Sequence, residues 1–384
     1  MNKLLSFFLF FLFLQCCKNK VEYGVIQNME TPNHKNNFEA IRLGTKEFHL
    51  DEETVNLIDY LQYIDSLDFL TFLNDHNKSI CFYDNNSAEY LYRINLENLR
   101  NQICGYYWDN GNIFAYSYNS GILFSIDSSN NVKSKYLMSN ASKGNKDMIY
   151  PAPYLQSLAP LKKYDNKILS VGFVTGETSF ETTNNRTVVT IFDLDDSSIS
   201  NVVNYPEIYT LYNWAGGFTY RMPSYDLVNE SIIINFPACH YLIKYSLATG
   251  IQSNHYAGGS TIEYIKSFPF SKNKTIDENR AWVWYMNNPS YEGVLYDKYR
   301  EQYYRISRLP IRDYNVKERG NRKPIVIIIL DANLNYIGEV NLPPDVYFLP
   351  GNCYVSKEGF NIQVLTEDED KLTFYLYKFS SNEL

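Results

Sequence analysis

The densest group of aromatic and basic side chains lies in residues 291–305. The Asp-Lys-Tyr-Arg stretch in its middle predicts a hairpin turn, with one strand before it and one after it. Tyrosine rings beside guanidinium groups suit sugars, peptides or carboxylates, because rings offer flat faces and guanidinium groups offer paired donors. The alternative is a structural hairpin, with its tyrosine rings packed inside the fold and arginine paired with aspartate. The candidate ligand-binding residues are Tyr296, Asp297, Arg300, Tyr304 and Arg305.

Sequence motifs for nucleophilic, phosphate and metal chemistry do not occur. Gly258-Gly-Ser260 lacks the second glycine and the following helix of a nucleophile elbow, so we interpret it as a turn. No GxxxxGK or GxGxxG loop is present, and the five histidines form neither HxxxH nor HExxH. The acidic stretches 193–196 and 367–370 lack the EF-hand pattern and are interpreted as solvated turns. We therefore expect no metal and no cofactor.

Residues 1–16 predict a lipoprotein signal peptide. Lys3 precedes an apolar run that is too short to span a bilayer stably. Leu14-Gln15-Cys16-Cys17 ends this run and resembles the bacterial lipobox, in which a cysteine becomes the lipidated first residue. Cys17 fits that position better than Cys16, because the residue before it is then small. Several acyl chains anchor a protein durably, and the polar residues 17–37 predict a flexible tether.

Length, composition and charge exclude several classes of protein. The chain has 384 residues, of which 45% are hydrophobic and 16% aromatic, so it can bury a large core and is not intrinsically disordered. Its formal net charge of -8 argues against nucleic acid as a partner, since phosphate binding needs a basic surface. No later run approaches the length of an apolar membrane span.

Four further cysteines lie far apart inside strand-like stretches, without a CxxC pair. An exported compartment permits disulfides, so two bridges are conceivable. Small buried thiols are the favoured interpretation, since cysteine packs well in apolar cores. The residues concerned are Cys81, Cys104, Cys239 and Cys353.

Short apolar strands separated by turns fill the rest of the chain, and they predict an all-β fold. They fall into six groups, at about residues 67–94, 103–137, 161–203, 225–256, 293–340 and 347–379. Groups of about four strands with this spacing indicate a six-bladed β-propeller over residues 38–384. A seven-bladed ring and a large sandwich are the alternatives. Residues 51–67 have apolar side chains at helical spacing, but they could equally pair as strands.

The first strand-like stretch, residues 38–50, has no partner of its own. We expect it to join the sixth blade and close the ring, which would remove exposed strand edges. The predicted pairing is between Ile41 to Phe48 and Leu372 to Phe379.

Several stretches resemble an uncharacterised family of Bacteroidetes lipoproteins, a domain of unknown function. After the lipobox these are Phe48-His-Leu-Asp51, Leu61-Gln-Tyr-Ile64, Phe69-Leu-Thr-Phe-Leu-Asn74, Ile80-Cys-Phe-Tyr-Asp84, Gly293-Val-Leu-Tyr-Asp297 and Tyr303-Tyr-Arg305. The resemblance implies a six-bladed, TolB-like propeller in an exported, membrane-anchored protein. It implies no established activity and no catalytic residues. Lys18-Asn-Lys-Val-Glu22 lacks an acid-rich surface-export signal, which favours the periplasmic face of the outer membrane.

These features favour a binding module of the cell envelope, tethered to the membrane by its lipid and holding a protein partner or a glycan. An alternative is a carbohydrate hydrolase or lyase, which would place paired carboxylates in the central channel of the ring. A purely structural envelope protein is a third possibility. Whether the protein is an enzyme stays open, although the lack of catalytic motifs favours binding.

Overall fold

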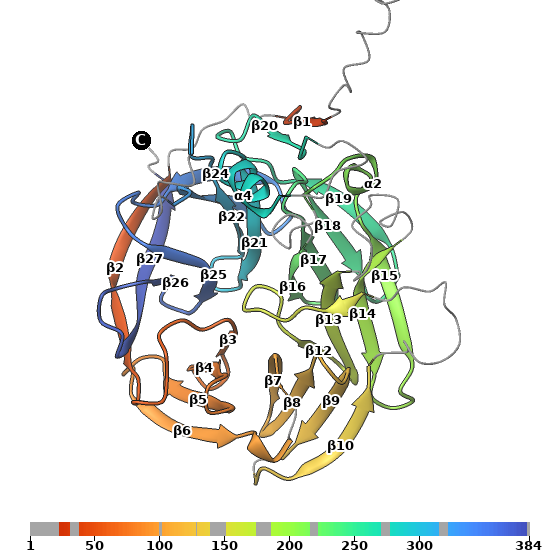
Figure 1. Cartoon of the computed structure of the whole chain (residues 1–384), viewed down its shortest axis with the longest axis vertical. Coiled ribbons are helices and arrows are strands. Elements are labelled where there is room, and N and C mark those ends of the chain that lie inside the picture. The colour runs from red at the N-terminus through yellow and green to blue at the C-terminus, as the bar shows by residue number, and fades with distance from the viewer. Residues whose placement is uncertain are drawn as a thin grey trace, which may run out of the picture.

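The computed structural model is a ring of six β-sheets around a central axis (Figure 1). It describes residues 23–30, 38–99, 102–127, 129–138, 151–173, 186–215, 222–269, 277–314 and 322–381. Each sheet is one blade of antiparallel strands, and the blades follow one another around the ring in chain order. The six-bladed β-propeller predicted from the sequence is confirmed, and the described residues form neither a seventh blade nor a sandwich.

Blades 1 and 2 are runs of four strands joined by tight turns. The turn between β7 and β8 holds Asn110 at φ +47° and Gly111 at φ +87°, which explains why an Asn-Gly pair predicts a hairpin there. Blade 1 contains β3 (Leu61–Ile64), β4 (Phe69–Asn74), β5 (Ser79–Asp84) and β6 (Tyr90–Asn95), and blade 2 contains β7 (Gly105–Asp109), β8 (Asn112–Ser117), β9 (Ile122–Ile126) and β10 (Val132–Leu137).

Blades 3, 4 and 5 repeat this plan, and blade 3 adds a short fifth strand. Blade 3 contains β11 (Ala152–Pro153), β12 (Lys162–Tyr164), β13 (Lys167–Phe173), β14 (Thr187–Asp193) and β15 (Ile199–Asn204). Blade 4 contains β16 (Ser224–Val228), β17 (Ser231–Asn235), β18 (Tyr241–Ser246) and β19 (Gln252–Tyr256), and blade 5 contains β21 (Ser290–Asp297), β22 (Gln302–Arg308), β23 (Ile325–Asp331) and β24 (Tyr336–Asn341).

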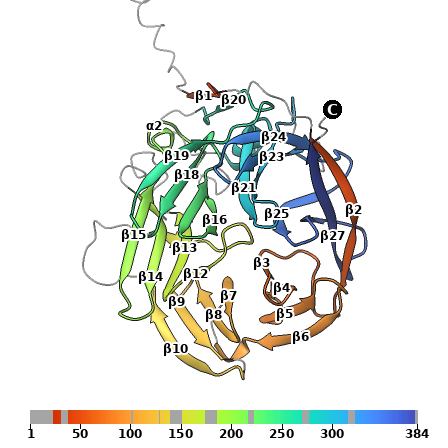
Figure 2. The ribbon, with the colours of Figure 1, turned by 180° about the vertical axis from the view of Figure 1, so that it is seen from behind.

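Blade 6 closes the ring with strands from both ends of the chain. It contains β25 (Phe348–Val355), β26 (Phe360–Val364), β27 (Lys371–Ser381) and, outermost, β2 (Phe38–His49). Ile41 lies opposite Lys378 and Phe48 lies opposite Leu372, so the predicted closure is confirmed. Figures 1 and 2 show β2 running along β27 from both sides of the molecule.

The inner strand of blade 6 differs from the prediction. Within the sixth group, the apolar stretches of the sequence predict two separate strands here, at 347–349 and 353–356. The structure instead has the single strand β25, whose register with β26 shifts between Leu349 and Cys353. The intervening residues are thus accommodated as an irregularity within one strand.

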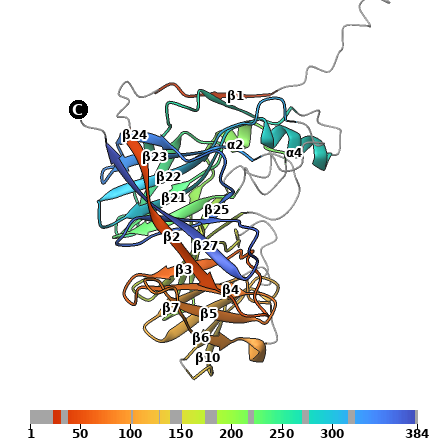
Figure 3. The same cartoon turned by 90° about the vertical axis from the view of Figure 1, so that its left-hand side faces the viewer.

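Residues 23–30 lie inside the segment expected to be a tether, and they dock on the propeller. β1 (Val25–Gln27) pairs antiparallel with β20 (Tyr264–Lys266), and Figure 3 shows it along the rim of the ring. The Asn28 side chain donates to the backbone carbonyls of Gly259 at 2.8 Å and Ile262 at 2.9 Å. This part of the expected tether is therefore bound to the fold and not extended into solvent.

The described helices are short and lie in connections between strands. They are the 3-10 turn η1 (Glu97–Leu99), α2 (Ile208–Leu211) and α4 (Glu278–Met286). The helical alternative for residues 51–67 is wrong, since only β3 forms regular structure in that stretch. Within the described ranges, no helix has the length and apolar character needed to cross a bilayer.

The core consists of apolar side chains packed between neighbouring blades, including rings such as Trp214 and Tyr225. Many tyrosine rings are buried there, where the ring fills space and the hydroxyl can reach a hydrogen-bond acceptor. The Tyr225 hydroxyl, for example, donates to the Pro160 carbonyl at 2.6 Å. All four propeller cysteines are free thiols, as the favoured interpretation expected, and burial raises the pKa of Cys81 to about 11.

Candidate functional site

The hairpin predicted at residues 291–305 is present at the inner edge of blade 5. β21 and β22 pair so that Tyr296 lies opposite Tyr303 and Asp297 lies opposite Gln302. A turn follows Asp297, and Glu301 completes it at φ +52°. The hairpin was therefore located correctly, and the surroundings of its side chains decide what it can do.

Asp297 is fully buried and stabilises the turn of this hairpin. Its carboxylate accepts the backbone N–H groups of Tyr299 at 3.0 Å and Arg300 at 3.1 Å, and the Tyr304 hydroxyl at 2.9 Å. The Arg300 guanidinium pairs with the same carboxylate at 2.8 Å and also donates to two backbone carbonyls of blade 6, at 3.2 and 3.0 Å. These contacts join blade 5 to blade 6, which favours the structural alternative for these residues.

Arg305 has no exposed surface, so it cannot contact a ligand in this arrangement. Its guanidinium carbon lies 3.5 Å from the centre of the Tyr291 ring. A buried cation needs acceptors for its N–H groups, and blade 4 supplies them. The acceptors are Asn235 Oδ1 at 2.8 Å and the backbone carbonyls of Cys239 at 2.6 Å, His240 at 3.1 Å and Ala257 at 2.9 Å.

Tyr296 lies at a cavity of about 500 Å³ on the propeller axis, which we call the central cavity. Residues from β3, β7, β12, β16, β21 and β25, the innermost strands of all six blades, line it. Most of them come from the C-terminal ends of these strands and from the turns that follow, so the cavity lies toward one end of the axis. Among the predicted site residues, the lining includes Tyr296.

Three carboxylates line the central cavity, and each is paired with a lysine from another blade. Asp226 is the most buried, and its second oxygen accepts the backbone N–H of Tyr296 at 2.9 Å. Charges that neutralise each other at short range give the cavity little net attraction for an ion. The pairs are Asp226 with Lys162 at 3.2 Å, Asp109 with Lys163, and Asp65 with Lys298.

Aromatic rings form much of the remaining wall. The Tyr63 and Tyr354 rings stack with their centres 5.2 Å apart, and the Trp108 ring meets Phe82 edge-on at 5.2 Å. Burial raises the pKa of Tyr107 and Tyr296, so these hydroxyls stay protonated donors at neutral pH. The rings in the lining are Tyr63, Tyr107, Trp108, Tyr296 and Tyr354.

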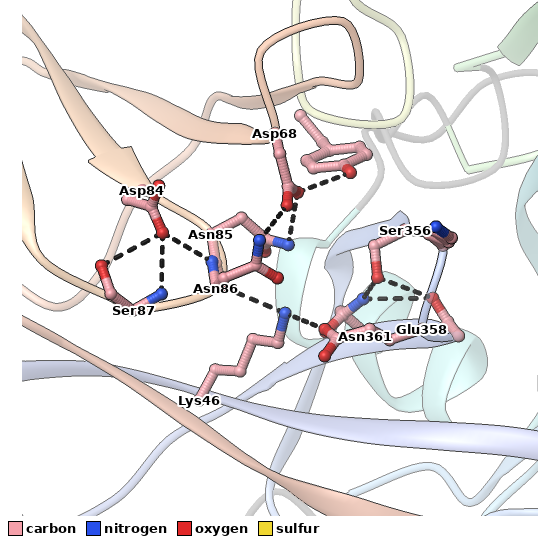
Figure 4. A network of polar contacts seen from close by, with 12 residues as sticks. Lys46, Asp68, Asp84, Asn85, Asn86, Ser87, Ser356, Glu358 and Asn361 are labelled. Carbon is pink, nitrogen blue, oxygen red and sulfur yellow. Dashed lines mark hydrogen bonds and ion pairs between the residues drawn. The ribbon is translucent and has the colours of Figure 1, made fainter.

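A polar network between blades 1 and 6 holds part of this wall in place (Figure 4). The Asp68 carboxylate accepts the Tyr63 hydroxyl at 2.8 Å and the Asn85 amide at 2.8 Å. The Asn85 side-chain oxygen accepts the Tyr354 hydroxyl at 2.7 Å, and Lys46 of β2 donates to the Asn85 carbonyl at 3.0 Å. Both stacked tyrosines are therefore fixed by hydrogen bonds from outside the cavity, which preorganises the aromatic wall.

Binding of a hydroxyl-rich, uncharged ligand is the chemistry that this arrangement supports. Paired Asp and Lys side chains keep spare acceptor and donor positions for hydroxyl groups, and fixed rings can pack on the apolar faces of sugars. Each of the three cavity carboxylates is held in an ion pair with a lysine, which fixes its position in the wall. In the described part of the chain, no cluster of His, Cys, Asp and Glu could hold a metal ion.

Sequence reasoning found Tyr296 and missed the rest of the cavity. The lining residues come from six strands spread between Leu61 and Val355, and no local motif connects them. A shared position at the end of the innermost strand of each blade is the signal that could have identified them. Cys17, the predicted lipidation site, lies outside the described residues.

Comparison with known proteins assigns the chain to a family. A crystal structure of a DUF4221 family member from Bacteroides vulgatus ATCC 8482 superposes with a TM-score of 0.74 at 20% identity, covering 91% of this chain and 100% of that one. A crystal structure of a "Putative exported protein" from Bacteroides fragilis NCTC 9343 gives a TM-score of 0.53 at 8% identity, covering 91% of this chain and 98% of that one. No curated protein matches the chain. The family model described as "Domain of unknown function (DUF4221)" matches residues 35–341, and the chain therefore belongs to this family.

Proposed function

We propose that the protein is an exported lipoprotein whose propeller binds a neutral glycan in the central cavity. One observation carries the binding role: residues from all six blades converge on a cavity of about 500 Å³ whose charges are already paired. A pocket of this size with aromatic walls and convergent polar groups is typical of small-ligand sites. A glycan fits better than an ion, because the paired charges offer hydrogen bonds without a net charge.

The carbohydrate hydrolase or lyase is the second candidate, because Asp65, Asp109 and Asp226 do line the cavity. For any of them to act as a general acid, its lysine partner would have to release it when the substrate binds. Binding without hydrolysis is therefore the stronger proposal.

The test is calorimetric titration of the full chain, in detergent, with a panel of neutral oligosaccharides. For the oligosaccharides that bind the wild type, Trp108→Ala and Tyr296→Ala should each weaken the affinity about tenfold, which corresponds to about 1.4 kcal/mol. Tyr90→Ala is the matched control, because Tyr90 is exposed on the outer strand of blade 1 and lies outside the cavity. Affinity that none of the cavity variants alters would remove the central cavity as the site. Hydrolysis of a bound sugar that Asp109→Asn abolishes would establish the enzyme instead.

Anchoring is the second part of the proposal. The lipobox supports lipidation at Cys17, and the structural neighbour from Bacteroides fragilis, whose name is "Putative exported protein", supports transport out of the cytoplasm. Placement on the periplasmic face of the outer membrane, and the likeness to TolB-type propellers, remain predictions. Metabolic labelling with a fatty-acid analogue should mark the native protein and not Cys17→Ser, while labelling of both would refute lipidation at this residue.

A further inference from the structure

A second cavity, of about 580 Å³, lies toward the opposite end of the propeller axis, and we call it the distal cavity. Residues at the starts of the innermost strands line it, including Glu292 of β21 and Phe348 of β25, whereas the central cavity is lined by the ends of the same strands. Helix α4 forms one wall through Trp282, and Figure 3 shows this helix on one side of the ring. The two cavities therefore present different residues to different faces.

The distal cavity holds more basic than acidic side chains, in a chain whose formal net charge is -8. Its lining holds three basic side chains, Arg308, Arg322 and Lys323, against the two carboxylates Asp59 and Glu292. Cavity walls screen a charge less than water does, so a guanidinium without an ion-pair partner attracts anions strongly here.

Two of the three cations have fixed structural partners. The Arg308 guanidinium binds Glu292 through two contacts, at 2.8 and 2.9 Å, so this pair is neutral. The buried Lys323 ammonium donates to the Tyr285 carbonyl at 3.1 Å, to the Ser290 hydroxyl at 3.3 Å and to the Asn288 carbonyl. These acceptors are uncharged, and burial lowers the pKa of Lys323 well below its ordinary value, so attraction of an anion is left to the third basic side chain.

Arg322 is the third cation, and it is exposed. Its guanidinium lies over the Tyr347 ring, and within the part of the chain that the structure describes no carboxylate pairs with it. Stacking engages the flat face of a guanidinium and leaves its edge N–H groups free to donate in parallel to a carboxylate. Arg322 is thus preoriented for an anion.

Trp282 gives the cavity an apolar platform. Its side chain is 49% exposed, which is unusual for the largest apolar side chain. Its indole N–H donates to the Tyr314 hydroxyl at 3.2 Å, so the ring is held by its polar edge and offers its face. Asp59 has no ion-pair partner among the described residues, and its carboxylate can accept hydroxyl groups.

We propose that the distal cavity binds a carboxylated sugar, a hexuronate unit of an acidic glycan. Arg322 would bind the carboxylate, Trp282 would pack on the sugar face, and Asp59 would accept ring hydroxyls. A hexuronate combines these three features on one ring, whereas a simple anion would use Arg322 alone. The inference concerns the opposite face from the central cavity and a different ligand, so it does not depend on the function proposed there.

The test is titration of the full chain, in detergent, with tri-galacturonate and with its neutral counterpart, galactotriose. Wild type should bind the acidic sugar at least tenfold more tightly, and the affinity should fall as salt is raised. Arg322→Gln should remove this preference, and Trp282→Ala should weaken binding without removing the preference for acid. Arg280→Gln is the matched control, because Arg280 is exposed on α4 and does not line the cavity.

The inference would be overturned by no binding of tri-galacturonate at millimolar concentration, by equal affinity for galactotriose, or by an unchanged preference in Arg322→Gln. Equal binding of a sulfated trisaccharide would also overturn it, since the site would then recognise any anion. Arg322 and Trp282 are exposed, so both variants should keep the wild-type melting temperature, and this is measured first. Trp108→Ala in the central cavity should leave tri-galacturonate binding unchanged, which separates the two proposals.

Discussion

Replacing Arg305 by leucine should destabilise the propeller strongly, although the sequence made this residue a candidate ligand contact. The leucine would leave Asn235 Oδ1 and the carbonyls of Cys239 and Ala257 buried without the donors at 2.8, 2.6 and 2.9 Å, while the His240 carbonyl keeps the Ala257 N–H at 2.9 Å. Each orphaned acceptor costs about 1 to 3 kcal/mol. The variant no longer has to bury a charge, and this offsets part of the cost. We therefore expect the free energy of unfolding to fall by about 3 to 5 kcal/mol, as for other broken buried pairs.

The assay is equilibrium unfolding in urea, followed by the fluorescence of the four tryptophans. Arg305→Leu should lower the transition midpoint with an unchanged slope, since the folded surface stays the same. The urea midpoint of Arg305→Lys should lie between those of the wild type and Arg305→Leu, because one ammonium group cannot reach all of the acceptors. Lys298→Ala is the control on the same hairpin. Its ion pair with Asp65 is exposed to solvent, so losing it should not change the midpoint. A loss below about 1 kcal/mol in Arg305→Leu would refute a structural role for the cation.

Two further predictions concern the contacts that hold β1 to the ring, one of which places His240 Nε2 3.3 Å from the Ile26 carbonyl oxygen. Burial lowers the pKa of His240 from 6.5 to about 4, so the stability that its neutral ring contributes is fully present above pH 6.5 and is lost as the pH falls through 4. That loss should reach about 3 kcal/mol, and His240→Gln should flatten the curve of unfolding free energy against pH; an equally steep curve would contradict this. Asn28→Ala removes the hydrogen bonds to Gly259 and Ile262, so amide exchange in residues 23–30 should rise about 30-fold while blade cores stay protected. Unchanged exchange there would show that β1 is held by other contacts.

The strands could be predicted from the sequence because their signals are local. The residue types of Asn110 and Gly111 predict a turn, and the apolar runs on either side predict its two strands. The closure of the ring by β2 could also be predicted, since a strand without a neighbour needs a partner and only the last blade could supply one. Helix α4 was missed, although Asp277 caps it by accepting the backbone N–H of Arg280 at 2.9 Å.

The surroundings of the candidate residues could not be predicted, because their partners lie in other blades. β22 is buried on both faces, so the alternation of side chains along it does not reveal where Arg305 points. Its acceptors lie 48 to 70 residues away in sequence, at distances that only the stacking of blades defines. The pairing of Asp65 with Lys298 has the same origin, since it joins blade 1 to blade 5.

The closure of the ring by β2 has a consequence for how the chain folds. β2 is synthesised before all of the other blade strands, and its partner β27 is synthesised last. The contact between Glu47 and Lys371 spans 324 residues. Bringing such distant ends together costs about 4 kcal/mol more in chain entropy than closing a four-residue turn. Five blades must therefore assemble before the eleven residue pairs between β2 and β27 become favourable, so blade 6 should form last and slowly. Until then β2 and the edge of blade 6 are unpaired strands, which makes this the folding step most exposed to aggregation and to proteolysis.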